Sequence, residues 1–187
     1  MMPAAKPKTC KSCRTKFVPV RPLQVVCGFA CAMAHADKAK ARATATEALK
    51  AARAHREAKV KAKTRAQWMK EAQASFNRWV RLRDADLPCI SSGRHHTGQY
   101  HAGHYRSTAA APQLRFNPDN VHKQSSCDNN HKSGNIVEYR INLIKKIGLD
   151  RVEALENDNT SHHWTIEDLR EIKARYTAMA KAIDKSK

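Results

Sequence analysis

The spacing of hydrophobic and polar positions divides the chain into a long stretch suited to helix and a later stretch suited to loops and short strands. Between Ala30 and Leu87 the sequence contains neither proline nor glycine, and Ala, Lys, Arg and Glu dominate. This composition is typical of helix, and one unbroken helix over it would approach about 80 Å at roughly 1.5 Å per residue. We therefore predict a long basic helical arm over residues 32–87.

The two halves of this arm differ in apolar content. From about Ala32 to Ala66 the large aliphatic side chains are few, and they are Met33, Leu49 and Val60. From Trp68 onward, apolar positions recur at helical spacing and predict a face that packs on a core, formed by Trp68, Ala72, Phe76, Trp79 and Val80. The first half is either a solvated helix or a partly disordered arm. Either state is compatible with an arm that binds along DNA.

After Leu87-Pro88 the chain changes character. Residues 89–135 contain four glycines, two prolines and six of the ten histidines, which is typical of loops and short strands around a site. Helices are predicted at 136–147 with Gly148 as C-cap, at 150–156, and from Thr165 onward with Asp168 at the capping-box position. Their expected buried residues are Val137, Ile141, Leu143 and Ile144 in the first of these helices, and Leu169, Ile172, Tyr176, Met179 and Ile183 in the last.

Four cysteines near the N-terminus form two close pairs. Two residues separate Cys10 from Cys13, three separate Cys27 from Cys31, and 13 residues lie between the pairs. Two thiolates on one tight turn reach a single Zn²⁺ at about 2.3 Å, and a second pair completes a tetrahedron without an open position. Residues 1–31 contain too little apolar material to fold alone, so we predict a structural zinc knuckle there instead of four unrelated thiols.

The charge of the chain is strongly positive and uneven. The net charge is +18, with 20 Lys and Arg against 6 Asp and Glu in residues 1–87 and 15 against 11 in residues 88–187. A polyanion such as DNA is the simplest partner, because basic side chains displace counterions from phosphates. A membrane is disfavoured, since no run of about 18 apolar residues exists. The first thirty residues lack the apolar segment of a signal peptide, so we expect a cytoplasmic chain with reduced thiols.

Four segments of the sequence match a known family. They are the four-cysteine knuckle, Ala-Gly-His-Tyr-Arg-Ser at 102–107, Leu-Arg-Phe at 114–116 followed by Asn-Val-His-Lys-Gln at 120–124, and Lys-Ser-Gly-Asn at 132–135. On these motifs, over essentially the whole chain, the sequence resembles the HNH (His-Me finger) nucleases, and among them the phage-lambda NinG/Rap recombination endonucleases. The resemblance implies an α+β, mostly helical fold with a zinc knuckle (1–31), the long basic helix (32–87), and a small ββα-metal, HNH-like core with C-terminal helices (88–187).

The resemblance also implies roles in phosphodiester hydrolysis, which needs a base to activate water and a divalent cation to hold the phosphate. His104 would be the general base, Asn120 would orient the His104 ring by hydrogen bonding, and Asn129 would bind catalytic Mg²⁺ or Mn²⁺. His101 and His131 are further candidate ligands of this ion or of a phosphate. The alternative is that the histidines only cap loops. The basic side chains expected to contact DNA are Lys59, Lys61, Lys63, Arg65 and Arg106.

The sequence departs from the family at a second zinc brace, which the resemblance would place on two Cys-x2-Cys pairs. Cys89 is present, but Ser92 stands at its partner position, and Ser125 and Asp128 stand at the second pair, with Cys127 one place out of register. Zinc on Cys89, Cys127 and either Asp128 or His131 is one alternative. We predict instead that the brace is lost and that packing replaces it, through Ile90, Leu114, Phe116 and Val121.

Three functions agree with these features. The first is a metal-dependent endonuclease that cuts branched recombination intermediates such as Holliday junctions and D-loops, a substrate class that the resemblance alone supplies. The second is a non-catalytic protein that binds DNA junctions with a degenerate nuclease site. The third is a zinc-finger transcription regulator, which would leave residues 89–135 without a purpose. The expected partners are branched or duplex DNA, a second copy of the chain through the Trp68–Trp79 face, and phage or host recombination proteins, in the bacterial cytoplasm near the nucleoid.

Overall fold

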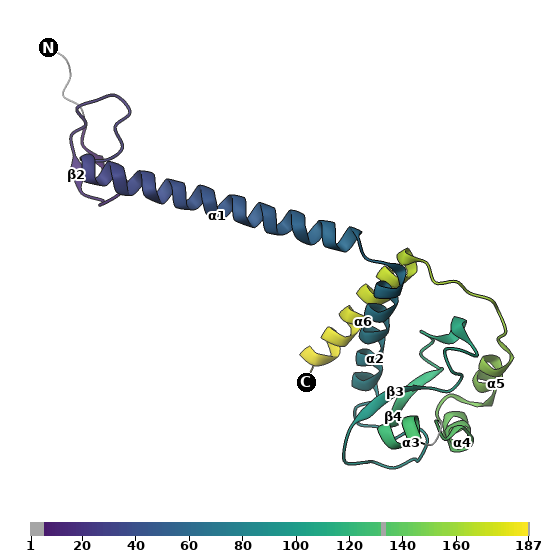
Figure 1. The fold of residues 1–187 in the computed structure, drawn as a ribbon. Helices are drawn as coiled ribbons and strands as arrows, with labels where there is room; N and C mark the ends of the chain where they lie inside the picture. The colour runs from purple at the N-terminus through teal and green to yellow at the C-terminus, as the bar shows by residue number, and fades with distance from the viewer. Residues whose placement is uncertain (1–5, 132–133, 187) are drawn as a thin grey trace. The chain divides into compact units, whose positions relative to one another are not determined.

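The computed structural model describes residues 6–131 and 134–186, and for His131 only the backbone (Figure 1). The chain is a mostly helical α+β protein, as predicted, and its described residues form two small sheets. It forms two units, Met1–Ala62 and Lys63–Lys187. The division differs from the expected boundaries after residues 31 and 87, because the second half of the predicted arm packs with the C-terminal part of the chain.

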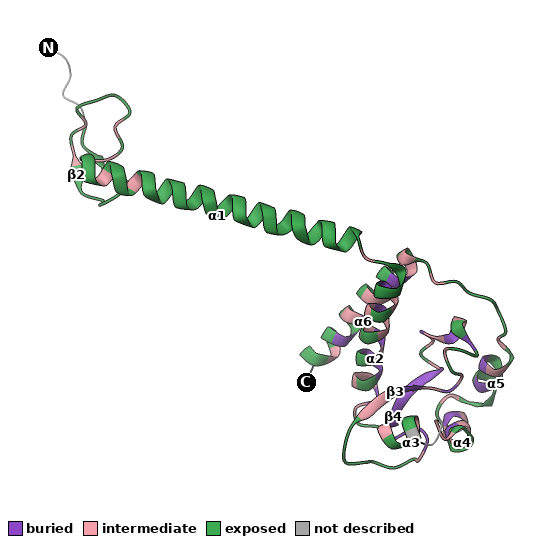
Figure 2. Cartoon of the chain, in the orientation of Figure 1, coloured by how far each residue is buried: buried purple, intermediate pink, exposed green. Residues whose placement is uncertain are grey.

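The N-terminal unit consists of a cysteine-bearing loop structure followed by one long helix. Strands β1 (Lys8–Thr9) and β2 (Lys16–Phe17) pair antiparallel, with Lys8 opposite Phe17. Helix α1 (Phe29–Lys61) then runs for 33 residues without one buried side chain (Figure 2). Of the two states left open for this segment, the structure has the solvated helix, since its sparse large apolar residues define no face to bury.

Helix α1 does not continue into α2 (Arg65–Arg83), so the expectation of one unbroken helix is wrong. The Thr64 hydroxyl accepts a hydrogen bond from the Gln67 N–H at 3.3 Å, and the Gln67 side chain accepts one from the Thr64 N–H at 2.9 Å. This reciprocal capping box satisfies two of the backbone donors that the start of a helix leaves unpaired. A new helix therefore begins inside a stretch that has no proline or glycine.

The first apolar cluster of the C-terminal unit lies between α2 and α6 (Ile166–Lys185). All the predicted core residues of α2 are buried in it, and the Phe76 ring packs edge-on against the rings of Phe116 and Tyr176. The predicted capping box at the start of α6, between Thr165 and Asp168, is also present. Helix α6 therefore packs on the Trp68–Trp79 face within the same chain.

The second apolar cluster is formed by α4 (Ile136–Ile147), α5 (Leu149–Asn157) and the loops around them. Its buried members are Ile90, Tyr105, Ala111, Leu114, Tyr139, Leu143, Val152 and Leu155. The four residues expected to pack around the centre of the unit are all buried, two in this cluster and two in the first. That part of the packing prediction is confirmed.

Two predicted helix faces need correction. In α4 the buried residues are Tyr139 and Leu143, while Val137 is 73% and Ile141 is 45% exposed. The helix joins the second apolar cluster through Tyr139 and Leu143, four residues apart, and this leaves Val137 and Ile141 toward solvent. In α6, Met179 is 39% exposed and the adjacent Ala180 is buried instead. A small side chain is what the close packing of α6 on α2 admits.

The centre of the C-terminal unit is an antiparallel pair of strands followed by a short helix. Strand β3 (Tyr100–His104) pairs with β4 (Val121–Ser125), with His104 opposite Val121, and α3 (Ser126–His131) follows β4 directly. The loop between the strands contains the 3-10 turn Pro112–Leu114. The strand–strand–helix order is therefore present, while its assignment as an HNH-like core remains a prediction.

A buried carboxylate ties the end of α2 to β4. Asp84 is 2% exposed and accepts hydrogen bonds from Arg83 Nη2 at 2.7 Å, the Lys123 N–H at 3.1 Å and Lys146 Nζ at 3.1 Å. The same two cations reach Nδ1 of His122, at 3.0 Å from Arg83 and 2.9 Å from Lys146. Burial lowers the pKa of His122, so its ring stays neutral. Its role is to stabilise the fold.

Among the helices of the described parts of the chain, none combines the length with the apolar composition that a bilayer crossing demands.

Candidate functional site

The four N-terminal cysteines meet at one place, as predicted. Their sulfur atoms all lie within 4.8 Å of one another, with 3.5 Å from Cys13 to Cys27 and 3.5 Å from Cys27 to Cys31. Cys10 and Cys13 lie on the turn between β1 and β2, and Cys31 lies in the first turn of α1. Four sulfur ligands in this spacing could bind a metal such as zinc and would leave no position for substrate.

The electrostatics of the cluster favour a bound cation. Burial raises the pKa of Cys10, but N–H groups of Cys13, Cys27 and Ser12 outweigh this effect and lower the pKa to about 6. Hydrogen bonds with the neighbouring thiols, Cys31 first, raise the pKa of Cys27 to about 12, because they favour its protonated form. A divalent cation at the centre would replace the shared protons, since the thiolate is the form that binds metal.

His104 stands at the end of β3 beside a pocket of about 510 Å³. Its Nε2 lies 3.0 Å from the Arg115 carbonyl oxygen, so Nε2 carries the proton and donates it, which leaves Nδ1 as an acceptor. Burial lowers the pKa of His104 below its ordinary value, although the bond to the Arg115 carbonyl acts in the opposite direction. The ring is thus a neutral base with a fixed tautomer.

Asn120 does not orient the His104 ring by a direct hydrogen bond, which corrects the predicted role. Its Oδ1 accepts from the Arg106 N–H at 2.8 Å, and its Nδ2 donates to the carbonyls of Arg106 at 3.0 Å and Leu114 at 3.2 Å. Asn120, at the end of the loop between β3 and β4, therefore binds the start of that loop at Arg106 and its interior at Leu114. Because Leu114 precedes Arg115, this brace also positions the carbonyl that holds His104. The sequence could not reveal this indirect arrangement, because a main-chain carbonyl has no side-chain signature.

Asn129 and His101, two predicted ligands of a catalytic cation, lie next to each other. Asn129 Nδ2 is 3.2 Å from His101 Nδ1, and Asn129 lines the same pocket as His104. Rotation of the Asn129 amide by 180° would present its oxygen beside the imidazole nitrogen. The side chain of His131 lies outside the described residues. No Asp or Glu side chain is found among the described residues that line this pocket.

The glycine before His104 is required by a side chain on the neighbouring strand. A Cβ at Gly103 would lie 1.9 Å from Oε1 of Gln124, so no other residue fits there. Gln124 is fully buried and donates to Ser91 Oγ and to the Gly134 carbonyl, each at 2.6 Å. The Gly103 carbonyl in turn accepts from the Tyr139 hydroxyl at 3.0 Å. These contacts hold the strand on which His104 lies.

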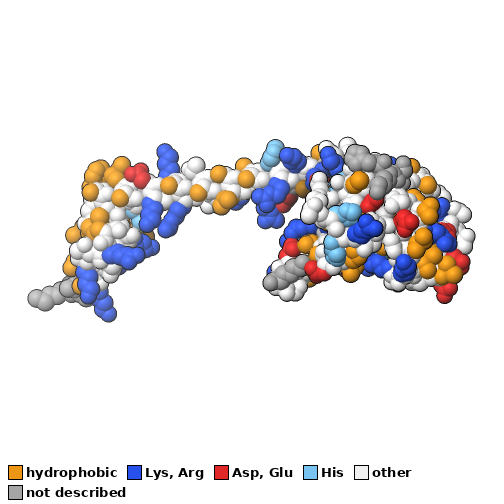
Figure 3. Space-filling model, turned by 90° about the horizontal axis from the view of Figure 1, so that it is seen from below, with side chains coloured by type: hydrophobic (Ala, Val, Ile, Leu, Met, Phe, Trp, Pro, Cys, Tyr) orange, Lys and Arg blue, Asp and Glu red, His pale blue; other side chains and the backbone are white. Residues whose placement is uncertain are grey.

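The basic residues predicted to contact DNA fall into two groups. Lys59, Lys61 and Arg65 are exposed, and Lys and Arg side chains project along α1 (Figure 3). Lys63 instead binds Glu71 at 2.6 Å and lies over the Trp68 ring. Arg106 donates to the carbonyls of Leu155, Glu156 and Asp158, and so caps the C-terminus of α5. Lys63 and Arg106 thus stabilise the fold, because each side chain has close partners within its own unit.

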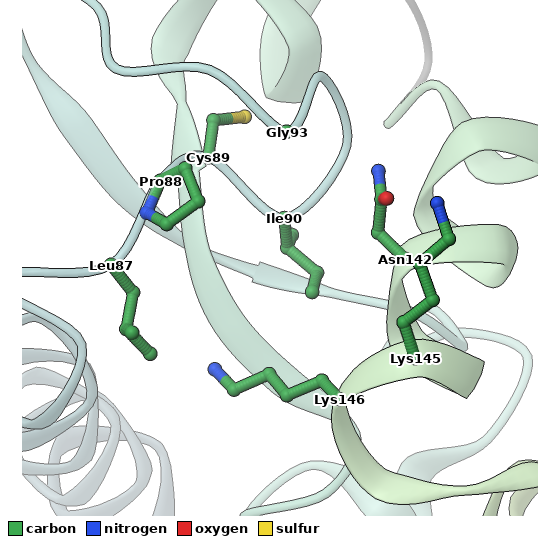
Figure 4. A pocket seen from close by; sticks show the side chains of 8 residues that line it. All are labelled: Leu87, Pro88, Cys89, Ile90, Gly93, Asn142, Lys145 and Lys146. Atoms are coloured by element: carbon green, nitrogen blue, oxygen red, sulfur yellow. The ribbon is translucent and has the colours of Figure 1, made fainter.

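A separate pocket of about 250 Å³ lies at the start of the loop before β3 (Figure 4). Its lining residues are Leu87, Pro88, Cys89, Ile90, Gly93, Asn142, Lys145 and Lys146. None of them is a predicted catalytic residue, and the ammonium of Lys146 is engaged by Asp84 and His122. The candidate active site is therefore the pocket at His104.

Comparison with known proteins places the chain in a family of phage proteins. The model of the family described as "Bacteriophage Lambda NinG protein" matches residues 2–186, and the chain belongs to this family. It is 50% identical over 129 residues to protein ninG of Escherichia phage lambda, which covers 69% of this chain and 63% of that protein. Protein ninG of Salmonella phage P22 is 49% identical over 129 residues, covering 69% and 64%.

Protein ninG of Enterobacteria phage H19B is 53% identical over 116 residues, which cover 62% of this chain and 58% of that protein. The matched part of the chain thus spans less than two thirds of the length of these curated relatives. No solved structure matches the chain.

Proposed function

We propose that this NinG-family chain is a metal-dependent, structure-selective DNA endonuclease that cuts branched recombination intermediates such as Holliday junctions and D-loops. It would act on DNA in the cytoplasm of the bacterial host. The proposal rests above all on one observation: His104 is a partly buried, neutral imidazole whose Nε2 is held by the Arg115 carbonyl, with Nδ1 left to accept a proton beside a pocket.

The chemistry of His104 suits a general base for water. The lowered pKa keeps the ring neutral near pH 7, which is the form that can remove a proton. Its fixed tautomer means that no reorganisation is needed before the proton transfer. Asn120 supports this geometry through the loop, so we assign it a positioning role and not a direct one.

Asn129 and His101 are the described side chains that would hold a catalytic cation. An amide oxygen suits Mg²⁺ or Mn²⁺, and an imidazole nitrogen favours Mn²⁺ of the two. When bound, such an ion neutralises charge on the scissile phosphate and on the leaving oxygen. In the absence of a carboxylate among the described lining residues, the phosphate itself would supply much of the negative charge that retains the ion.

The nature of the substrate is supported by charge and by the family. A net charge of +18 with an exposed basic α1 favours phosphate contacts that do not depend on base sequence. The preference for branched DNA comes from the family resemblance, and the proposed partners in recombination come from the same source.

A second candidate function is junction binding without cleavage. The observation that favours it is the lack of a carboxylate ligand in the described lining of the His104 pocket, since most catalytic sites for Mg²⁺ use at least one. In that case His104 and Asn120 would only hold the loop after β3.

Substitution of His104 separates the two functions. His104→Ala should reduce cleavage of a labelled four-way junction by about a hundredfold to ten-thousandfold in Mg²⁺ or Mn²⁺, because the base acts in the transition state. Affinity for the junction should stay nearly unchanged. His95→Ala is the matched control, because His95 is an exposed histidine in the loop before β3. Binding without any nicking by the wild-type protein would overturn the nuclease proposal and leave junction binding.

A further inference from the structure

The backbone around Cys89 repeats the turn that carries Cys10 and Cys13. In the first turn the Arg14 N–H donates to the Cys10 carbonyl at 3.0 Å, and the Cys10 N–H donates to the Thr15 carbonyl at 2.9 Å. In the second, the Gly93 N–H donates to the Cys89 carbonyl at 2.8 Å, and the Cys89 N–H donates to the Arg94 carbonyl at 2.9 Å. The fourth residue after each cysteine has a positive φ, 63° at Arg14 and 66° at Gly93. The chain builds the same cysteine turn twice.

The two thiols are also approached in the same way by a second segment. The N–H of Cys27, the first residue of the second cysteine pair, donates to Cys10 Sγ at 3.4 Å. The N–H of Ser125, the last residue of β4, donates to Cys89 Sγ at 3.2 Å. In both places a backbone N–H from a second segment is therefore directed at the sulfur of the first cysteine of the turn.

Three potential ligand atoms of different kinds meet beside this turn. Cys89 Sγ, a ring nitrogen of His96 and a carboxylate oxygen of Asp128 lie within 4.8 Å of one another. Cys89 and Asp128 are buried and lie 3.4 Å apart, while His96 is exposed and its Nε2 is 2.6 Å from Ser92 Oγ. In Figure 4 the sulfur of Cys89 points to the side opposite the ammonium of Lys146, away from that cation.

We propose that Cys89, His96 and Asp128 bind a second Zn²⁺, with a water molecule or the Ser92 hydroxyl in the fourth position. Thiolate, imidazole and carboxylate are all zinc ligands, and zinc accepts them in one tetrahedral set at about 2.0–2.3 Å. Mg²⁺ does not suit a thiolate, so this site differs in chemistry from the one at Asn129.

The proposal replaces the prediction that the brace is lost. It also excludes Cys127 as a ligand, because that thiol is exposed and is absent from the cluster.

An ion here would connect two segments that the apolar clusters do not join directly. Cys89 and His96 lie in the loop before β3, and Asp128 lies in α3, one residue before Asn129. The ion would therefore fix the start of α3 and the position of Asn129. This structural site goes beyond the proposed function, and its existence does not depend on whether the protein cuts DNA.

Metal content tests the proposal without any DNA. The purified full chain, dialysed against a weak chelator, should hold about two zinc ions by mass spectrometry, one in each site. His96→Ala should hold about one, and Cys89→Ser should also hold about one. His96→Ala is the decisive variant, because His96 is exposed and its loss leaves both apolar clusters intact.

The matched controls are His95→Ala and Cys127→Ser, an exposed histidine and an exposed thiol next to the proposed ligands. Both should keep about two ions, with circular dichroism spectra like that of the wild type. Cys10→Ser should also fall to about one ion and identifies which site each ion occupies. A wild-type content near one ion, or a His96→Ala protein that keeps two, would overturn the second site.

Discussion

Helices α1 and α2 come from one stretch without proline or glycine, yet they are stabilised in opposite ways. In α1 every side chain is at least partly open to solvent, and ion pairs such as Arg53–Glu57 and Lys50–Glu47 lie on its surface. In α2, five residues are buried, including Trp68, Phe76 and Trp79. Helix α1 is stabilised by the helix propensity of alanine and charged residues, whereas α2 is stabilised by its packing against α6.

This contrast shows what composition decides and what it leaves open. Freedom from proline and glycine determines that both segments are helical. The spacing of a few large apolar residues determines which helix acquires partners. The boundary between them depends on two polar side chains, Thr64 and Gln67, whose capping box starts α2.

The largest expected effect on stability comes from removing a large buried side chain of α2 from the core. Phe76→Ala should lower the free energy of unfolding of the C-terminal unit by about 3–5 kcal/mol, because the fully buried ring contacts Trp79, Phe116 and Tyr176. Tryptophan fluorescence in urea measures this unit alone, since all three tryptophans, Trp68, Trp79 and Trp164, lie in it.

The matched change in α1 is Leu49→Ala, at a side chain that is 73% exposed. It should alter helix content and stability by no more than about 0.5 kcal/mol, as followed by circular dichroism at 222 nm. A loss comparable to that of Phe76→Ala would mean that α1 has a partner that buries Leu49, and the comparison of the two helices would fail.

A smaller effect is expected from removing exposed charge at the end of α1. Lys59→Gln together with Lys61→Gln should weaken binding to linear and branched DNA alike, by about tenfold at low salt. The slope of log affinity against log salt should become shallower by about 1.8, if each lysine contacts one phosphate. Fluorescence anisotropy over a salt series measures both quantities.

The control removes the same charge elsewhere, with Lys181→Gln and Lys185→Gln at the exposed end of α6. These changes should leave the salt slope nearly as in the wild type. Equal losses in the two double variants would show that only net charge matters and that α1 has no particular role in binding.

The smallest effect is expected at the junction between the two helices. Thr64→Ala should lower the stability of the C-terminal unit by about 1 kcal/mol, because it removes the N-cap of α2. Thr46→Ala is the control inside α1, where the hydroxyl only bonds back to the Arg42 carbonyl. That change should be neutral or slightly stabilising, since alanine is the better helix former. Thermal melts that gave both variants the same loss would remove the capping box as the cause of the helix start.

Much of the fold could be predicted from the sequence, because its signals are local. Helices α4, α5 and α6, the stripe on α2 and the cysteine pairs follow from periodicity and spacing. The buried face of α4 was predicted only in part, since Tyr139 is selected by a long-range hydrogen bond to the Gly103 carbonyl. Contacts between distant segments leave no periodic trace in the sequence.

The candidate site could be predicted less fully than the fold. The motifs brought His104, Asn120 and Asn129 to attention, and the structure places them around one loop and one pocket. The role of Asn120 and the support of His104 both depend on main-chain carbonyls, which all residues possess. Arg106 looked like a surface cation because the three carbonyls at the end of α5 that it binds are about 50 residues away in sequence.

The absence of buried side chains in α1 determines how fast its backbone amide hydrogens exchange with solvent. Its amide hydrogens are protected only by helical hydrogen bonds that can open locally, without disturbing either apolar cluster. Deuterium should therefore replace them far sooner than the amide hydrogens of α2 around Phe76. The same brief openings present lysine and arginine peptide bonds to proteases. The lifetime of the intact chain in a cell would then be set in α1, by a cut that leaves the C-terminal unit folded.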